Sequence, residues 1–494
     1  MTSNSADART IHQATDYSMF IDGAWVESES GYRMEATSPS VGGIIGTVPE
    51  GTRADAQQAI TAASRAQPAW AALSAYGRAA FMERVAGLVE ERRDYLARTL
   101  TLDQGKPLVA EAHGEVDELI EYWRMAAADG KRLEGSMPAS VDAHKRVLAY
   151  RVPRGVVGLI TPWNWPYTMP SEVLAPALSS GNAVVWVPAP STSVCAIKLA
   201  ECIVDSGIPA GVFNMVTGPG PVVGDEIAVN PGTQAIGFIG SIATGHRVAE
   251  RAAGKALLLE MGGNGPMVIL DDADLDKAAE ASLVAAFLCA GQSCTAGERF
   301  LVQESVHDAF VEKLIAAIQR NIRLGDPFDA ATTIGPLNNE ATAAKMDRHI
   351  ADAREHGAKV IAGGQRAHGF PTNLYYQATV LDGVTTDMEV AREETFGPII
   401  PISTIRDESE ALEIINGSPY GLLTAVWTRD LARGLKFAEA ARVGWVNINE
   451  STNYWESQLP FGGRAGSQSG TGRVGGRYSM ETFTELKTVI INLD

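Results

Sequence analysis

The sequence contains one cysteine in a setting that suits a covalent reaction. Cys294 lies in the stretch AGQSCTAGERF (290–300), between Gly291 and Gly297, with polar Gln, Ser and Thr beside it. A cysteine thiolate is a strong nucleophile, and small neighbours leave room for a substrate. A free cysteine is more often a small buried hydrophobe. This stretch alone leaves both interpretations open.

A carboxylate and an amide follow two other predicted strands. Glu260 ends a strand in LLLEMGGNGPMVIL (257–270), and Asn164 follows a strand in ITPWNWP (160–166). A carboxylate at the carboxyl end of a parallel strand lies where α/β sheets place their sites, and it can act as a general base. The alternatives are a helix cap or an ion pair for Glu260 and a turn residue for Asn164.

Alternating strand and helix patterns would position these residues. Residues 53–130 have apolar residues at helical spacing and predict mostly helix. The strands predicted after that region are 155–160, 182–187, 211–217, 235–240 and 256–260, with helices between them. Such alternation predicts βαβ units, a parallel sheet and a doubly wound α/β domain that binds a nucleotide.

A second α/β series follows in the sequence. It begins after a strand at 266–270, includes helices at 305–322 and 407–416, and ends before the tail ELKTVIINLD (485–494). The tail has a strand pattern without a local partner. It therefore predicts pairing with RVLAYRV (146–152) or with another subunit.

Composition narrows the partners. The 494 residues carry a formal net charge of -18, which disfavours phosphate backbones and anionic membranes, so we expect neither nucleic acid nor membrane as a partner. Apolar stretches are too short to span a bilayer, and residues 1–18 lack the apolar segment of a signal peptide. The four cysteines predict reduced thiols and a cytoplasmic protein, and the eight histidines show no metal-ligand spacing.

Five motifs in order carry a family resemblance. They are Pro-Trp-Asn-Trp-Pro (162–166), Glu-Met-Gly-Gly (260–263), Gly-Gln-Ser-Cys (291–294), Glu-Glu-Thr-Phe-Gly-Pro (393–398) and Pro-Phe-Gly-Gly (460–463). From about residue 20 to its end, the chain resembles the aldehyde dehydrogenase superfamily, in the NAD(P)-dependent, non-acylating branch. The spacing of 34 residues between Glu260 and Cys294 matches the family.

The resemblance implies three catalytic residues. Cys294 would add to the aldehyde as a thiolate, forming a thiohemiacetal that loses hydride to the nicotinamide and leaves a thioester. The Asn164 amide and the Cys294 N–H would stabilise the oxyanion. Glu260 would then activate water as a general base and release the acid.

The resemblance also implies a Rossmann-like coenzyme site. Gly240 and Ser241 would present a helix N-terminus to the pyrophosphate, and Gly218 would approach the adenine side. Glu394 would hold the nicotinamide ribose and Phe396 would pack near the ring, although a surface charge and a core aromatic fit that stretch equally well. The full predicted set is Ile160, Trp163, Val187, Gly218, Gly240, Ser241, Met261, Glu394 and Phe396.

The chain departs from the family pattern after Asn182. Most relatives have Lys-Pro-(Ser or Ala)-Glu where this chain has Val187 to Pro190 in VVWVPAPST. Both the lysine and the glutamate that hold the adenosine ribose are therefore replaced. We expect NAD more than NADP.

The loop before Pro460 also departs from the pattern, because NINESTNYWESQLPFGG is longer than usual. The predicted substrate residues are Trp165, Met169, Glu172, Ser293, Thr295, Tyr454 and Trp455, with Glu450 and Glu456 adding acid. An acidic, aromatic tunnel favours an apolar, aromatic or cationic aldehyde. Succinate semialdehyde is disfavoured, since that branch places an arginine near the position of Glu172. Alternatively, these side chains point to solvent or core.

The resemblance divides the chain into parts. We expect a cofactor-binding domain (1–130 and 154–258), a catalytic domain (259–445), a small β oligomerisation element (131–153 and 480–494), and a substrate-tunnel loop with its return segment (446–479). A hairpin near 146–153 and the tail at 486–493 would pair across subunits in a dimer or tetramer. The rival functions are a CoA-acylating enzyme, which usually lacks the glutamate base, and a non-catalytic relative.

Overall fold

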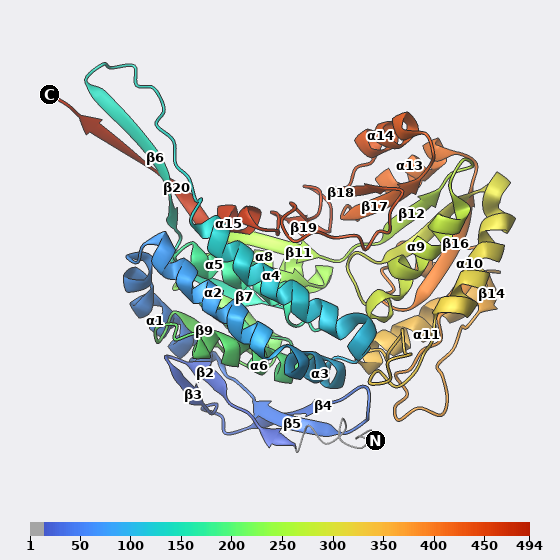
Figure 1. The fold of residues 1–494 in the computed structure, drawn as a ribbon, viewed down its shortest axis with the longest axis horizontal. Helices are drawn as coiled ribbons and strands as arrows, with labels where there is room; N and C mark the ends of the chain where they lie inside the picture. Colours follow the sequence, from blue (N-terminus) through green and yellow to red (C-terminus); the bar gives the residue numbers. More distant parts are fainter. Residues whose placement is uncertain (1–13) are drawn as a thin grey trace, which may run out of the picture.

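The computed structural model describes residues 14–494, whose strands form four sheets (Figure 1). The largest has eight strands in the order β19-β11-β10-β7-β8-β9-β2-β3. Its strands are β2 (Met19–Ile21), β3 (Ala24–Val26), β7 (Val156–Ile160), β8 (Ala183–Val187), β9 (Phe213–Met215), β10 (Ala235–Gly240), β11 (Ala256–Met261) and β19 (Gly470–Thr471). The five central strands, β11 to β9, are parallel, as the sequence predicts.

The strand order reverses beside β7. The chain runs from β7 outward to β8 and β9, and then returns to place β10 and β11 on the other side of β7. Loops that leave neighbouring strands in opposite directions open a crevice at the carboxyl edge of the sheet. The loops after β7, β10 and β11 carry Asn164, Ser241 and Gly262, so the predicted residues converge at this crevice. The doubly wound α/β fold is confirmed.

Helices cover both faces of this sheet, as the helical spacing of their apolar residues predicts. They are α1 (Arg53–Ala71), α2 (Ala75–Glu91), α3 (Arg93–Asp103), α4 (His113–Gly130), α5 (Thr168–Ser179), α6 (Ser193–Asp205), α7 (Asp225–Val229) and α8 (Ile242–Arg251). Thr52 and Asp55 form a capping box that starts α1. Helix α4 packs between α2 and α5, and this packing brings one face of α4 to the edge of the site.

A second sheet of seven strands has the order β14-β15-β16-β13-β12-β17-β18, and only its edge strand β14 is antiparallel. Its strands are β12 (Gly265–Ile269), β13 (Gly297–Gln303), β14 (Lys359–Ala362), β15 (Thr379–Asp382), β16 (Ile399–Ile405), β17 (Leu423–Trp427) and β18 (Trp445–Ile448). Its helices are α9 (Leu275–Phe287), α10 (His307–Asn321), α11 (Glu340–Glu355), α12 (Glu389–Arg392), α13 (Glu408–Asn416) and α14 (Leu431–Ala440). The short link from β11 to β12 brings the carboxyl edge of the first sheet to the amino edge of the second.

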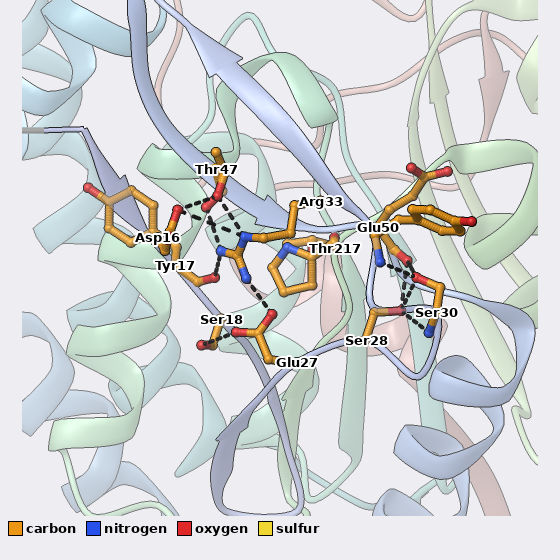
Figure 2. A network of polar contacts seen from close by, with 12 residues as sticks. Asp16, Tyr17, Ser18, Glu27, Ser28, Ser30, Arg33, Thr47, Glu50 and Thr217 are labelled. Carbon is orange, nitrogen blue, oxygen red and sulfur yellow. Dashed lines mark hydrogen bonds and ion pairs between the residues drawn. The ribbon is translucent and has the colours of Figure 1, made fainter.

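The strands at the N-terminal end of the described chain were not predicted from the sequence. Strands β1 (Thr15–Asp16), β4 (Arg33–Thr37) and β5 (Ile44–Pro49) form a small sheet. Figure 2 shows that Arg33 holds it together, donating to the Thr47 hydroxyl at 2.6 Å and pairing with Glu27. Thr217 donates to the Pro49 carbonyl at 2.7 Å, which ties the end of β5 to the loop that contains Gly218. The interpretation that residues 1–18 are not a signal peptide rests mostly on residues 1–13, outside the described chain.

The tail pairs within its own chain. Strand β20 (Thr484–Asn492) runs antiparallel to β6 (Lys145–Pro153) along its whole length, and the pair projects away from the body (Figure 1). The expected hairpin near 146–153 is therefore wrong, because this stretch is one extended strand whose partner is the tail, which joins it after α15 (Arg477–Phe483). No helix in residues 14–494 is long and apolar enough to cross a membrane.

Candidate active site

Two cavities meet at Cys294. The larger, of about 390 Å³, and the smaller, of about 190 Å³, share Met169, Glu260 and Cys294 in their walls. Cys294 is 9% exposed, so its thiol faces the cavities while the residue itself is embedded in the fold. A nucleophile at the junction can contact a molecule on either side. The geometry therefore favours the reactive interpretation of Cys294 over that of a core filler.

Unusual backbone conformations shape the loop that carries Cys294. Cys289 and Ala290 both have φ +54°, which is rare for residues with a side chain. Gly291 has φ +74°, and a Cβ there would lie 2.1 Å from the Gly397 carbonyl oxygen. The Cys289 N–H donates to both oxygens of buried Glu111 at 3.1 Å. The segment between α9 and β13 is thus fixed at several points before it reaches the thiol.

A direct hydrogen bond holds the side chain of Asn164 against the loop that carries Cys294. Its side-chain Nδ2 donates to the Gln292 carbonyl at 2.9 Å, and the residue is 2% exposed. Gln292 in turn accepts the Asn338 N–H at 2.9 Å through its side chain. The Asn164 amide is therefore held beside the segment that ends in Cys294, where it can donate to an oxygen on the substrate.

Glu260 provides a basic group next to the thiol. Burial raises the pKa of its carboxyl to about 7, and a hydrogen bond with Cys294 opposes part of that rise. Its Oε1 atom is buried and has no hydrogen-bond partner in the described part of the chain. Burial, and then Glu260, raise the pKa of the Cys294 thiol well above its ordinary value. The thiol is therefore protonated at rest, and Glu260 is the nearby group able to accept a proton.

The smaller cavity brings together five of the predicted coenzyme residues. Trp163, Gly240, Ser241, Glu394 and Phe396 all line it. The Glu394 carboxylate accepts the Gly263 N–H at 3.0 Å, and burial raises its pKa to about 8. The rings of Trp163 and Phe396 meet edge to face, with centroids 5.6 Å apart. These residues make a narrow slot with an aromatic wall and the N-terminus of α8 at one end.

The other predicted coenzyme residues lie outside the two cavity walls. Ile160 and Val187 are paired neighbours on β7 and β8, and Met261 is buried under Gly245. Gly218 has φ +144° and packs on Gly51, which explains a glycine there by the close approach of two backbones. Conversely, Thr342 and Lys345 of α11 line the smaller cavity, and no local motif pointed to either residue.

All seven predicted substrate residues line the larger cavity. They are Trp165, Met169, Glu172, Ser293, Thr295, Tyr454 and Trp455. Glu450 also lines it. Glu456 does not, and instead accepts a hydrogen bond from the Tyr454 hydroxyl at 2.6 Å. The rings of Trp455 and Phe461 meet edge to face at 4.8 Å. The loop and helix α5 therefore build one aromatic cavity, as the sequence predicts.

Among the wall residues that were not predicted from the sequence, Tyr122 and Glu118 change the interpretation of the charge of this cavity. Tyr122 of α4 donates to Glu172 at 2.5 Å and accepts the Trp455 indole N–H at 2.9 Å, and Glu118 lies beside it. Burial raises the pKa of Glu118 to about 7 and that of Glu172 well above its ordinary value. Glu172 therefore carries less negative charge than expected. Helical spacing could not show that this face of α4 reaches the cavity.

One cluster in the described chain has the geometry of metal ligands. Ligand atoms of His349, Glu389 and Glu393 lie within 4.8 Å of one another. Arg348 already bonds to both glutamates, at 2.8 and 2.9 Å. The guanidinium thus supplies the positive charge that these carboxylates need.

Comparison with known families gives a match over most of the chain. The sequence model described as "Aldehyde dehydrogenase family" matches residues 25–489. The succinate-semialdehyde dehydrogenase (NADP(+)) of Escherichia coli strain K12 is 40% identical over 476 residues, covering 96% of this chain and 97% of the relative. The betaine aldehyde dehydrogenase of Bacillus subtilis strain 168 is 37% identical over 480 residues, covering 96% and 97%.

Solved structures agree with the sequence comparisons. An NAD-dependent aldehyde dehydrogenase from Sinorhizobium meliloti superposes with a TM-score of 0.94 at 37% identity, covering 100% of this chain and 97% of that one. A succinate-semialdehyde dehydrogenase from Burkholderia pseudomallei has the same TM-score and identity, covering 99% and 100%. Relatives of this similarity share the whole fold.

Proposed function

The chain belongs to the aldehyde dehydrogenase family, and we propose that it oxidises an apolar, aromatic or cationic aldehyde to the free acid with NAD. NAD(P)-dependent oxidation of an aldehyde is the activity of the family. The observation that carries the proposal is the junction of two cavities at Cys294 and Glu260. One cavity would hold the aldehyde and the other the nicotinamide end of the coenzyme.

The side chains at the junction can perform each proton and bond transfer. Glu260 accepts the Cys294 proton, and the thiolate adds to the aldehyde carbon. The Asn164 amide and the Cys294 N–H donate to the oxyanion, each such donor contributing roughly 2.7–4 kcal/mol to the transition state. After hydride has left, the thioester remains on Cys294. Glu260 first passes the Cys294 proton to solvent and then takes a proton from water. The resulting hydroxide attacks the thioester, the bond to Cys294 Sγ breaks, and the carboxylic acid is released.

The slot of the smaller cavity fits a nicotinamide coenzyme, which supplies the hydride acceptor when bound. Gly240 has φ +158° and leads into α8, whose first residues offer backbone N–H groups to a phosphate. The hydrophobic Val187 and Pro190, at the positions of the usual lysine and glutamate, offer no cation for a ribose phosphate. This lack supports NAD over NADP.

The walls of the larger cavity support an uncharged or cationic substrate. Among the described residues that line it, none is lysine or arginine, and Glu118, Glu172, Glu260 and Glu450 are acids. Burial reduces the charge of the first three by raising their pKa values. Relatives are named for succinate semialdehyde, an anion, and for betaine aldehyde, a cation. The Lys106 ammonium lies 3.2 Å from the Trp165 ring centroid and occupies one face of that ring. Trp455 and Phe461 would therefore be the main aromatic contacts of the substrate.

Two further assignments complete the proposal. The ribbon of β6 and β20 would join subunits of a dimer or tetramer, because its exposed Leu486, Ile490 and Ile491 lie on strands with open edges. All four cysteines are free and buried, which supports a cytoplasmic location.

The test is coenzyme reduction by the purified protein, with a panel of aldehydes and without CoA. We expect NAD reduction with aromatic, aliphatic or cationic aldehydes and slower reaction with succinate semialdehyde. A preference for a carboxylated aldehyde would overturn the substrate assignment and leave the enzyme class intact. Activity that requires CoA would instead assign an acylating enzyme, and silence under both conditions a non-catalytic relative.

A further inference from the structure

We propose that Glu298 is a positioning residue that holds the loop of Glu394 and Phe396 in the shape required to bind NAD. The inference rests on the proposed coenzyme role of the smaller cavity. It goes further because Glu298 touches neither cavity and belongs to none of the five motifs that carry the family resemblance.

The carboxylate of Glu298 accepts hydrogen bonds from two successive backbone amides. Its Oε2 accepts the Thr395 N–H and its Oε1 accepts the Phe396 N–H, each at 2.8 Å. Such paired, charge-assisted bonds are short and directional. Because both bonds go to the backbone, they fix the path of the loop whatever its side chains are.

The loop that contains Glu394 and Phe396 has a strained backbone, which contacts with the rest of the protein must stabilise. Phe396 has φ +61°, in the left-handed region that disfavours a residue with a Cβ. The adjacent Glu394 points the other way, toward the smaller cavity and the Gly263 N–H. Releasing the two amides would let Phe396 relax, and Glu394 and the Phe396 ring would then leave their places in the slot.

The position of Glu298 is costly for a purely structural residue. It is 2% exposed, and burial raises its pKa to about 7, with the two amides and Lys345 opposing the rise. A buried carboxylate is tolerated when its partners are fixed around it. His349 also bonds to the Thr395 hydroxyl at 3.0 Å, so the loop is held at its backbone and at a side chain.

Glu298 also connects the loop to the nucleophile. It follows Cys294 by four residues, on the strand β13 that begins at Gly297. The same loop contacts the other side of the Cys294 segment, where the Gly397 carbonyl packs on Gly291. Strand β13 therefore sets the distance between the thiol and the slot for the nicotinamide ring.

The test is the variant Glu298→Gln, which keeps the shape but offers one acceptor to two N–H donors. We expect the dissociation constant of NAD, measured by calorimetry, and the KM for NAD to rise about tenfold, the effect of losing one hydrogen bond to a charged group. The KM for the aldehyde and the rate of Cys294 alkylation by iodoacetamide without NAD should stay within about twofold. Glu298→Asp keeps the charge but has a shorter side chain, so its dissociation constant for NAD should lie between those of the native protein and Glu298→Gln.

Two controls separate the possible outcomes. Glu304→Gln makes the same change at an exposed site just after β13 and should bind NAD as the native protein does. Native NAD affinity in Glu298→Gln would overturn the proposal. So would a general disturbance of the fold, in which the melting temperature and the alkylation rate fall and the KM values for NAD and for the aldehyde both rise. Glu394→Ala tests the premise: if it binds NAD normally, the coenzyme assignment of the slot fails, whereas weak binding there with normal binding in Glu298→Gln overturns only the role of Glu298.

Discussion

The two cavities that meet at Cys294 are built in different ways. The smaller cavity is formed at strand ends, by the turns after β7 and β10 and by a loop whose backbone is fixed by Glu298. The larger cavity is formed by side chains of α4, α5 and the long loop around Tyr454 and Trp455. The first depends on backbone geometry and the second on the choice of side chains.

This difference determines how each half of the site tolerates substitution. A turn that must present N–H groups tolerates few residue types, whereas an aromatic wall can be assembled from many combinations. A common coenzyme needs a constant slot, and each new aldehyde needs a different wall. Substitutions at the junction should therefore abolish the reaction, while those in the larger cavity should only change its preference.

The largest effect is expected at the junction itself. Cys294→Ala removes the nucleophile and should lower kcat by roughly a thousandfold or more, as in other enzymes that act through a covalent intermediate. NAD binding, measured by calorimetry, should persist. Cys202→Ala, on a buried face of α6, is the matched control and should keep its activity. Comparable activity in both variants would contradict the assignment of Cys294.

The next effect concerns the oxyanion. Asn164→Ala should lower kcat by about 10²–10³-fold with little change in the KM for NAD, because the amide acts on a charge that develops during reaction. The measurement is steady-state kinetics with the best aldehyde of the panel. A change confined to KM would mean that Asn164 merely shapes the loop through its bond to the Gln292 carbonyl.

A smaller effect is expected from pH. Glu260 has a pKa raised to about 7, so it is increasingly protonated below that pH and then cannot accept a proton. Turnover should fall by roughly tenfold for each unit below about pH 7, as expected for one essential base. Glu260→Gln should remove this limb and slow turnover at all pH values, because the variant can neither deprotonate Cys294 nor activate water. A native profile that is flat from pH 6 to 8 would refute the role of Glu260 as base.

The smallest effect tests the wall of the larger cavity. Glu450→Gln removes one negative charge from a half-buried position, so the KM for a cationic aldehyde should rise by about two- to fivefold, as for a partly solvated ion pair. The KM for an uncharged aromatic aldehyde should not change. Equal shifts for both substrates would show that Glu450 contributes shape and not charge.

The sequence predicted those parts of the site that depend on local motifs. Cys294, Glu260 and Asn164 each follow a recognisable element in a short motif, and the structure brings them together as expected. Tyr122 and Glu118 could not be predicted, because they reach the cavity through the packing of α4 against α5, about 50 residues away in sequence. Glu298 escaped notice for the same reason, since its partners lie near residue 396.

The fold shows a similar division. Fully buried apolar strands such as β8 and long helices such as α2 have patterns that their own residues determine. The pairing of β6 with the tail strand β20 was predicted only as one of two alternatives, because more than 300 residues separate the two strands. Strands β1 and β4 depend on the contacts of Arg33, which no local pattern reports.

The protonated state of Cys294 at rest has a consequence for how the protein withstands oxidants. Peroxide reacts with the thiolate and not with the thiol. Burial and the neighbouring Glu260 and Glu394, which raise the pKa of Cys294, therefore shield the thiol from sulfenic acid formation. The enzyme without coenzyme should thus be stored safely in air near neutral pH, and alkaline buffers should shorten its lifetime.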